Sequence, residues 1–301
     1  MVKKLVLLVV GIMMAALFAG CGNDAPKEQA SKKIQVVTSF NAMAEFAKAI
    51  GGDKVEVSTI IPDGVEPHDF ELKPENMKQL ATAQVFVYNG FGMEPWAKQA
   101  IEAAKNDKLV TVVATEGVEA IKNTDPEEIK EHGAEDPHAW LSLKDAKIEV
   151  KNIKDALVKA DPANKDYYEK NYTEYVGKLD AMIKKYEEQF AKAPHKNFVT
   201  GHAAFAYLSR DFGLEQNSVE DVFAEGEPNA AQLAKLIEYV KENNIKTIFA
   251  EEMASPEVSK TLAKEVGAKV ETIYTIESKE DDKTYLQRMD ENLAKIAESL
   301  K

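Results

Sequence analysis

The sequence predicts an α/β fold with two lobes of mostly parallel sheet, flanked by helices and joined by one long rigid helix. Short apolar segments alternate with amphipathic helical patterns on both sides of the chain's middle. Such alternation is typical of parallel sheets built from right-handed crossovers. The middle holds one long helical pattern without proline. With 301 residues, of which 45% are hydrophobic and 30% charged, the chain can form two soluble lobes with substantial cores.

Residues 1–20 are predicted to be a lipoprotein signal peptide. Lys3 and Lys4 precede an apolar run from Leu5 to Phe18, which is shorter than the roughly 20 residues that a membrane-spanning helix needs. The run leads into Ala19-Gly20-Cys21, which resembles a bacterial lipobox, and the chain has no other cysteine. Lipidation would account for a lone exported cysteine, because it cannot form an internal disulfide. The alternative is a plain exported protein with an incidental cysteine.

Residues 21–33 contain the lipidated Cys21 and a polar segment with almost nothing to bury, which predicts a flexible tether. The first lobe is expected over residues 34–162. Its strands are predicted at Ile34–Thr38, Val55–Ile61, Val85–Tyr88 and Leu109–Val113, and its helices begin at Ser39 as a cap, at Pro74 and at Pro95.

Residues 163–193 are predicted to form the linking helix. Tyr168, Leu179 and Phe190 belong to an apolar stripe at three- and four-residue spacing, and Gly177 is the single weak point. A helix of about 30 residues is roughly 45 Å long. Such a helix, packed along both lobes, would limit how far they can hinge.

The second lobe is expected over residues 194–301 and repeats the alternation of the first without a detectable sequence repeat. Its strands are predicted at Phe198–Thr200, Ser218–Phe223, Lys246–Ala250 and Lys269–Thr275, and its helices at Ala203 onward, Pro228–Asn243, Pro256–Val266 and Thr284–Leu300.

Four polar side chains stand where α/β sheets bind ligands, beyond the carboxyl ends of strands. His68, His202 and Glu277 each follow a predicted strand closely, and His138 lies in the connection after the fourth strand. Each histidine alone fits a hydrogen-bonding or surface role, but three equivalent positions together favour a metal. Their wide separation along the chain excludes a local zinc clip. We therefore predict one metal ion in the cleft between the lobes, with two ligands from each lobe.

Other polar residues near these positions are assigned separately. Asp69, Glu71 and Asp136 flank the ligand histidines and are candidates to orient their free ring nitrogens, although ordinary solvated carboxylates would look the same. His132 lies in a charged loop and His195 stands beside a lysine without acidic support. Both are left out of the site.

Several motifs together resemble the zinc/manganese substrate-binding lipoproteins of bacterial ABC importers. They are Glu66-Pro67-His68, Asn89 to Trp96, Asp136 to Leu141, Thr200 to Tyr207 and Glu225 to Pro228, and the likeness covers essentially the whole mature chain. The resemblance implies two lobes joined by a rigid helix, one divalent metal in the cleft, and delivery to the transmembrane subunit of an ABC permease with its cytoplasmic ATPase. It places the family's three histidines on His68, His138 and His202, and its carboxylate on Glu277. We expect an extracytoplasmic monomer, anchored by lipid on Cys21 to the outer face of the cell membrane.

Zinc is the predicted metal, with manganese as second choice. Three imidazoles and one carboxylate favour tetrahedral zinc, whereas manganese prefers more oxygen ligands. Zinc-binding members often carry a histidine-rich loop before the Asp-Pro-His motif, but here the segment from Asn123 to Asp136 is acidic and holds only His132. That departure leaves manganese open. The formal net charge of −13 makes nucleic acid an improbable partner.

The expected mechanism is capture and release, so the protein is not predicted to be an enzyme. Metal affinity should fall as the histidines protonate below about pH 6. One alternative is an extracellular zinc hydrolase in which Glu277 or Glu251 acts as general base. A surface adhesin is another. A siderophore- or corrinoid-binding lipoprotein would share the architecture, but three histidines at loop ends argue against it.

Overall fold

A computed structural model describes residues 33–301 except 124–128, 131–132, 223–228 and 252–255. The predicted signal peptide, Cys21, most of the tether, His132 and the segment from Glu225 to Pro228 lie outside the described residues. None of the helices in the described ranges is both long enough and apolar enough to span a membrane.

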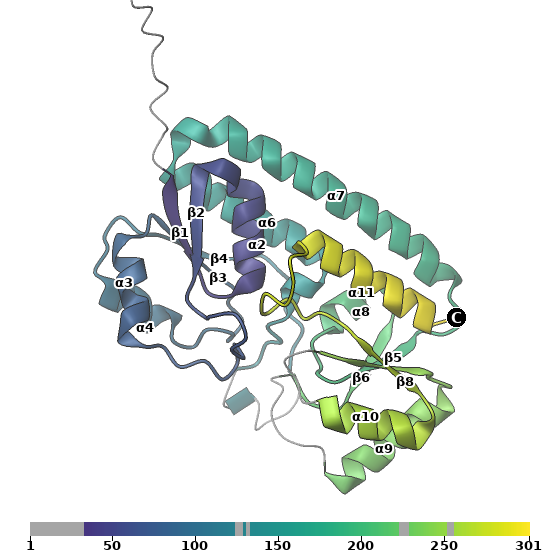
Figure 1. Ribbon diagram of the computed structural model, residues 1–301. Helices are drawn as coiled ribbons and strands as arrows, with labels where there is room; N and C mark the ends of the chain where they lie inside the picture. Colours follow the sequence, from purple (N-terminus) through teal and green to yellow (C-terminus); the bar gives the residue numbers. More distant parts are fainter. Residues whose placement is uncertain (1–32, 124–128, 131–132, 223–228, 252–255) are drawn as a thin grey trace, which may run out of the picture. The chain divides into compact units, whose positions relative to one another are not determined.

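The first sheet contains four parallel strands in the order β2-β1-β3-β4 (Figure 1). Val36 in the centre of β1 pairs with Val57 of β2 and Val85 of β3, so the apolar residues of neighbouring strands are in register. The strands are β1 (Ile34–Thr38), β2 (Val55–Thr59), β3 (Val85–Tyr88) and β4 (Val110–Val113), and the helices between them are α2 (Asn41–Gly51), α3 (Pro74–Thr82) and α4 (Ala97–Ala104).

Two long helices connect the first sheet to the second. Ser142 is the N-cap of helix α6 (Leu143–Ala160), and its side chain accepts a hydrogen bond from the amide of Asp145. Helix α7 (Lys165–Lys192) follows after a short turn. Helix α7 confirms the long helix between the lobes. Its apolar stripe is buried, including Tyr168, Leu179 and Phe190, because α7 packs on α2, α6 and α11 (Tyr285–Ser299).

The second sheet has the same topology as the first, with four parallel strands in the order β6-β5-β7-β8. This matching order explains why the two halves look alike without sharing a sequence repeat. The strands are β5 (Asn197–Thr200), β6 (Glu215–Ser218), β7 (Thr247–Ala250) and β8 (Lys269–Thr272), and the remaining helices are α8 (Ala206–Phe212), α9 (Ala230–Glu242) and α10 (Pro256–Val266).

Several element boundaries differ from those expected from the sequence. The strand predicted at Ser218–Phe223 was wrong, because β6 ends at Ser218; Phe223 itself is not described. Strand β6 pairs only with β5 and is polar, so its sequence lacks the apolar alternation that predicts strands. Helix α8 begins at Ala206 instead of Ala203. Ser39 does not cap α2, whose N-cap is Phe40.

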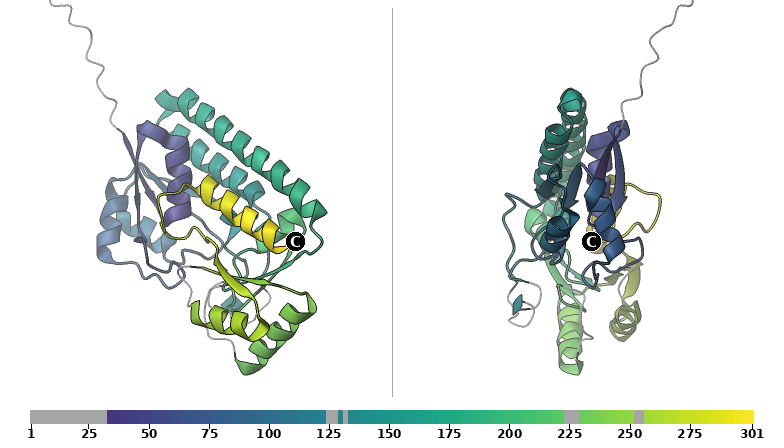
Figure 2. Two further views of the ribbon diagram at one scale, coloured as in Figure 1. Left: turned by 45° about the vertical axis from the view of Figure 1, so that its right-hand side comes forward. Right: turned by 90° about the vertical axis from the view of Figure 1, so that its left-hand side faces the viewer.

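The larger hydrophobic core extends through both halves of the molecule. It includes Phe46 of α2, Trp140, and Tyr285 and Met289 of α11, whereas a smaller core lies around α9 and α10. Figure 2 shows α11 beside α7, and the hydroxyl of Tyr285 donates to the carbonyl of Trp140 at 2.6 Å. The C-terminal segment therefore returns to the first half after completing the second sheet.

Candidate metal site

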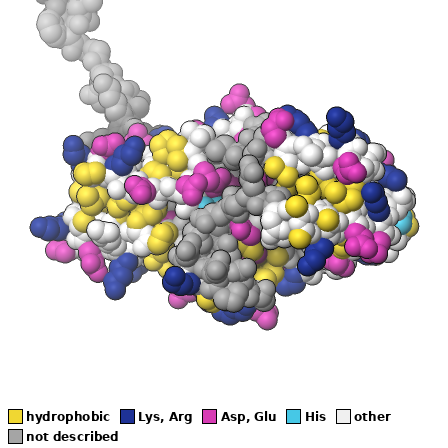
Figure 3. Space-filling model, turned by 90° about the horizontal axis from the view of Figure 1, so that it is seen from below, with side chains coloured by type: hydrophobic (Ala, Val, Ile, Leu, Met, Phe, Trp, Pro, Cys, Tyr) yellow, Lys and Arg dark blue, Asp and Glu magenta, His cyan; other side chains and the backbone are white. Residues whose placement is uncertain are grey.

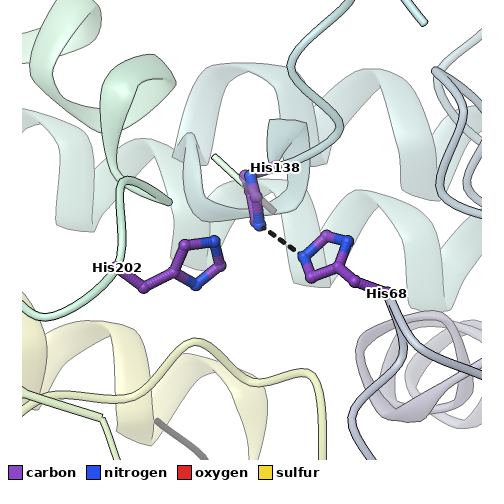
Figure 4. A group of neighbouring side chains, drawn as sticks. All are labelled: His68, His138 and His202. Carbon is purple, nitrogen blue, oxygen red and sulfur yellow. Dashed lines mark hydrogen bonds between the residues drawn. The ribbon is translucent and has the colours of Figure 1, made fainter. Parts of the chain in front are cut away.

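Three histidines from separate connections point toward one another (Figure 4). His68 lies in the connection between β2 and α3, His138 immediately precedes the 3-10 turn Ala139–Leu141, and His202 follows β5. Their side chains offer ligand atoms that all lie within 4.8 Å of one another. Figure 3 shows a small area of a histidine side chain between two regions of hydrophobic side chains, with acidic side chains close to it. The predicted histidines are thus brought together, and this cluster can hold a metal ion.

Glu277 completes the cluster with a buried carboxylate. Its Oε1 lies 3.3 Å from Nε2 of His138 and 3.6 Å from Nε2 of His68, and those two nitrogens are 3.2 Å apart. Ligand atoms in a tetrahedron with zinc bonds of about 2.0–2.1 Å are separated by about 3.3 Å. Three corners of the cluster therefore already have the spacing of a tetrahedral zinc site.

His202 forms the fourth corner. Its ring is 4.7 Å from that of His138 and 5.6 Å from that of His68, measured between centroids. Its Nε2 lies 2.7 Å from the carbonyl oxygen of Val222. A ring nitrogen that donates a hydrogen bond has no lone pair for a metal. Zinc would therefore bind through Nδ1 of His202 or exchange the Val222 contact for a metal bond.

Asp136 orients His138. Its Oδ1 lies 2.9 Å from Nδ1 of His138 and also accepts a hydrogen bond from the His138 amide at 2.9 Å, which leaves Nε2 facing the cluster. The prediction for Asp136 is confirmed by this contact. Burial opposes protonation, but the contacts with Asp136 and Glu277 outweigh it and raise the pKa of His138 to about 9. For His68, the nearby carboxylate is Glu66, which accepts from its amide at 3.3 Å. Asp69 and Glu71 are exposed, and their roles stay predictions.

The other site residues respond differently to burial. Burial, reinforced by the positive charge of His138, lowers the pKa of His202 to about 3. Burial alone would raise the pKa of Glu277, but its contacts with His138 and His68 hold this pKa well below the usual range. The metal-free cluster therefore contains an ionised carboxylate beside a protonated His138 and a neutral His202.

Two further carboxyl groups stand close to the cluster. Glu251 follows β7, is buried, and accepts from the His202 amide at 3.3 Å. Burial raises its pKa to about 8, and burial together with the charge of Glu277 raises the pKa of Glu66 to about 8. From the sequence, Glu251 is considered only as the general base of the hydrolase alternative, and no role is assigned to Glu66. The motif Glu66-Pro67-His68 was the available signal for the latter. His195 is exposed, in agreement with its exclusion.

The segment from Asn89 to Trp96 holds the loop that contains His138 in place through hydrogen bonds. Glu94 accepts from the amides of Asn89 at 2.9 Å and Gly90 at 3.0 Å, and thereby fixes the turn after β3. The side chain of Asn89 then donates to the carbonyl of Pro137 at 2.8 Å, one residue before His138. This motif therefore positions the loop and supplies no ligand atom to the histidine cluster.

A family model described as "Zinc-uptake complex component A periplasmic" matches residues 36–299. The chain belongs to this family. The family consists of metal-binding substrate-binding proteins of ABC importers, which are extracytoplasmic and are not enzymes. Membership confirms the predicted family, and the two parallel sheets with a long helix between the lobes match its solved structures.

Individual relatives agree with this family. The chain is 42% identical to the high-affinity zinc uptake system protein ZnuA of Bacillus subtilis, over 94% of either chain. It is 37% identical to the zinc-binding lipoprotein AdcA of Streptococcus pneumoniae, covering 99% of this chain and 61% of that relative. Among solved structures, the laminin-binding protein Lmb of Streptococcus agalactiae superposes with a TM-score of 0.81 at 32% identity, covering 90% of this chain and 100% of Lmb. Lmb is described as bifunctional, with adhesin and metal-transporting activity.

Proposed function

We propose that this protein captures zinc outside the cytoplasm and delivers it to an ABC permease. The observation that carries the proposal is the convergence of three imidazoles and one carboxylate from four separate loops. His68, His138, His202 and Glu277 are the proposed ligands, with Glu277 Oε1 at 3.3 and 3.6 Å from two of the ring nitrogens. The names of the zinc-uptake relatives support the same conclusion.

The ligand chemistry favours zinc over manganese. Imidazole nitrogens bind zinc more strongly than manganese, and the spacing of three ligand atoms fits a small tetrahedral site. The nearby carboxyl groups of Glu66 and Glu251 hydrogen-bond to the backbone amides of His68 and His202. Manganese remains the second choice, as a weaker ligand of the same site.

Delivery and anchoring complete the proposal. The permease's transmembrane subunit, driven by its cytoplasmic ATPase, would receive the metal from a monomer of this protein. Lipid on Cys21 would hold the protein at the outer face of the cell membrane, with residues 22–33 as a tether. The relative AdcA is named a lipoprotein, which supports the anchor.

A competition titration tests the binding step. Metal-free protein is titrated with zinc and with manganese against a chromophoric chelator, and His138→Ala is compared with His195→Ala, which removes an exposed histidine outside the cluster. We expect tighter binding of zinc than manganese, loss of zinc binding in His138→Ala, and wild-type affinity in His195→Ala. Wild-type zinc affinity in His138→Ala would overturn the proposed site.

The geometry does not favour the hydrolase alternative. A catalytic zinc keeps one coordination position for water, whereas four protein ligands close the site. Glu251 also accepts a hydrogen bond from the amide of His202 through one of its carboxyl oxygens. We expect no turnover of ester or peptide substrates by the zinc-loaded protein.

A further inference from the structure

The geometry points to Asn41 as a positioning residue that docks the Glu277 carboxylate onto the first lobe. Glu277 belongs by sequence to the second lobe, since it follows β8. Asn41 is the first residue of α2 in the first lobe and is only 4% exposed. This inference rests on the proposed function, because it concerns how one of the proposed zinc ligands is held.

Asn41 contacts three consecutive carbonyl groups of the Glu277 segment. Its side-chain amide donates to the carbonyls of Ile276 at 3.2 Å and Ser278 at 3.1 Å, and its backbone amide donates to the carbonyl of Glu277 at 3.3 Å. The side chain thus spans the peptide on both sides of Glu277. Because both side-chain N–H groups are used, the segment has little freedom to rotate the carboxylate away from His68 and His138.

Other donors of the first lobe hold the ends of the same segment. The indole nitrogen of Trp140 donates to the carbonyl of Thr275 at 2.7 Å, and the amide of Gly64 donates to the hydroxyl of Ser278 at 2.7 Å. Within the segment, the hydroxyl of Thr275 donates to Oε2 of Glu277 at 2.8 Å, which leaves Oε1 toward the histidines. Every carbonyl from Thr275 to Ser278 is therefore bonded to a first-lobe residue.

The backbone conformation of Ile276 shows why these hydrogen bonds from the first lobe are needed. Ile276 has φ of 63°, a left-handed conformation that is unfavourable for a β-branched residue. A strained backbone conformation persists only where contacts with the surrounding structure hold it in place. The buried side chain of Ile276 packs in the larger core. Asn41 holds the backbone at the same place, because it donates to the carbonyls of Ile276 and Ser278.

His202 is held in a different way. Its amide donates to Glu251, and its carbonyl accepts from Thr200 at 2.5 Å and Gln216 at 3.0 Å, all within the second lobe. The Glu277 carboxylate is therefore supported by the first lobe, whereas His202 is supported by the second. This division differs from the two-plus-two arrangement expected from chain order alone.

A double-mutant cycle tests the role of Asn41. Zinc affinity is measured by competition for the full chain, for Asn41→Ala, for Glu277→Ala and for both together. Asn41→Ala should lower zinc affinity by about 10–100-fold in the wild-type background, as is usual for a residue that orients a ligand. In the Glu277→Ala background the same change should have an effect of about twofold or less, because the carboxylate through which Asn41 acts is gone.

Asn152→Ala is the matched control. The side chain of Asn152 likewise spans two carbonyls, those of Ala114 and Glu116, each at 2.8 Å, but it lies wholly within the first lobe. Asn152→Ala should lower thermal stability without lowering zinc affinity. If Asn41→Ala is too unstable to study, Asn41→Ser replaces it in the same cycle, since it also removes the side-chain amide that donates to the carbonyls of Ile276 and Ser278.

The outcomes separate the two proposals. If the wild-type chain does not bind zinc, the proposed function is wrong. If the wild-type chain binds zinc but Asn41→Ala keeps wild-type affinity, as Asn152→Ala does, the positioning role is wrong and the function stands. Equal losses in the wild-type and Glu277→Ala backgrounds would also overturn it, because they would show that Asn41 acts independently of Glu277.

Discussion

The three imidazoles of the cluster have the same chemistry but different surroundings, and these surroundings decide which of them carries a proton. His138 is flanked by Asp136 and Glu277, whereas His202 is buried beside the charge of His138. A metal needs an unprotonated nitrogen. Zinc must therefore displace the proton on His138 at neutral pH, whereas His202 carries none to displace.

Zinc binding should release at least one proton per ion at pH 7.5, the one on His138. The pKa of His138 is raised to about 9, so His138 is protonated below that pH and competes with zinc. Apparent zinc affinity should accordingly rise by about tenfold per pH unit up to roughly pH 9, and then level off. The sequence-based expectation, a loss only below about pH 6, lacked the effect of the two carboxylates. Calorimetry in buffers of different ionisation enthalpy measures how many protons are released when zinc binds. A binding enthalpy that does not depend on the buffer would contradict the assignment of a proton to His138.

Asp136→Asn should weaken zinc binding by about 10–100-fold, because the ring of His138 loses the partner that orients it. The same change lowers the pKa of His138, so fewer protons should be released at pH 7.5. Competition titration and buffer-dependent calorimetry check both effects. Asp69→Asn is a control at an exposed carboxylate next to His68. Equal losses in the two variants would argue against a special role for Asp136.

Prediction from sequence succeeded at the residue scale where a residue type carries its own chemistry. Histidines placed after strands could be recognised as members of one cluster, and Asp136 beside one of them as its hydrogen-bond partner. Asn41 could not be recognised, because its contacts with the Glu277 segment join residues far apart in the chain. An asparagine at the start of a helix has no distinctive local signal.

Among the elements, the linking helix α7 has one unfavourable position. Gly177 lies in its exposed middle, and a Cβ added there would meet no atom within 4 Å. Gly177→Ala should therefore stabilise the protein by about 0.5–1 kcal/mol, since glycine loses more conformational freedom in a helix than alanine. Zinc affinity should stay unchanged. Denaturant unfolding of the metal-free protein measures the difference.

Gly213→Ala provides the opposite case. Gly213 ends α8 with φ of 62°, a left-handed conformation that alanine adopts at a cost of about 1 kcal/mol. This variant should be less stable than the wild type although space is available for the methyl group.

For the glycine in the linking helix the contradicting outcome is the opposite one. Destabilisation by Gly177→Ala would show that α7 does not behave as a regular helix at that point.

Elements with a strong apolar pattern were predictable, and polar ones were not. Strand β3 and helix α7 lie close to their expected positions because their buried side chains follow the period of a strand and of a helix. Strand β6, with the sequence Glu-Gln-Asn-Ser, is positioned by backbone pairing with β5 and by side-chain hydrogen bonds such as that from Gln216 to the carbonyl of His202. Its place in the sheet depends on tertiary contacts that the local sequence does not encode.

At the scale of the whole molecule, the proposed zinc site lies between two halves that are already linked by a shared core and by α7. A ligand that binds only the folded state stabilises it by about 2.7 kcal/mol at a free concentration one hundred times its dissociation constant. We expect zinc to raise the free energy of unfolding by this amount in the wild type. His138→Ala should show no such increase at the same zinc concentration, and an increase there would indicate binding elsewhere.

The return of the C-terminal segment to the first lobe was the main feature of the whole molecule that the sequence did not predict. The two-lobe division followed from the order of strands, but the packing of α11 on α2 and α7 brings residues from opposite ends of the chain together. The Glu277 segment precedes this helix and reaches the first lobe with it. This is why a ligand assigned to the second lobe has first-lobe supports.

The most direct test of the central claim is a crystal structure of the zinc-loaded protein with anomalous data at the zinc edge. The expected result is one strong peak bonded to nitrogens of His68, His138 and His202 at about 2.0–2.1 Å and to an oxygen of Glu277 at about 2.0–2.2 Å. A zinc peak that lacks contacts with these four side chains, or that lies outside the cluster, would contradict it.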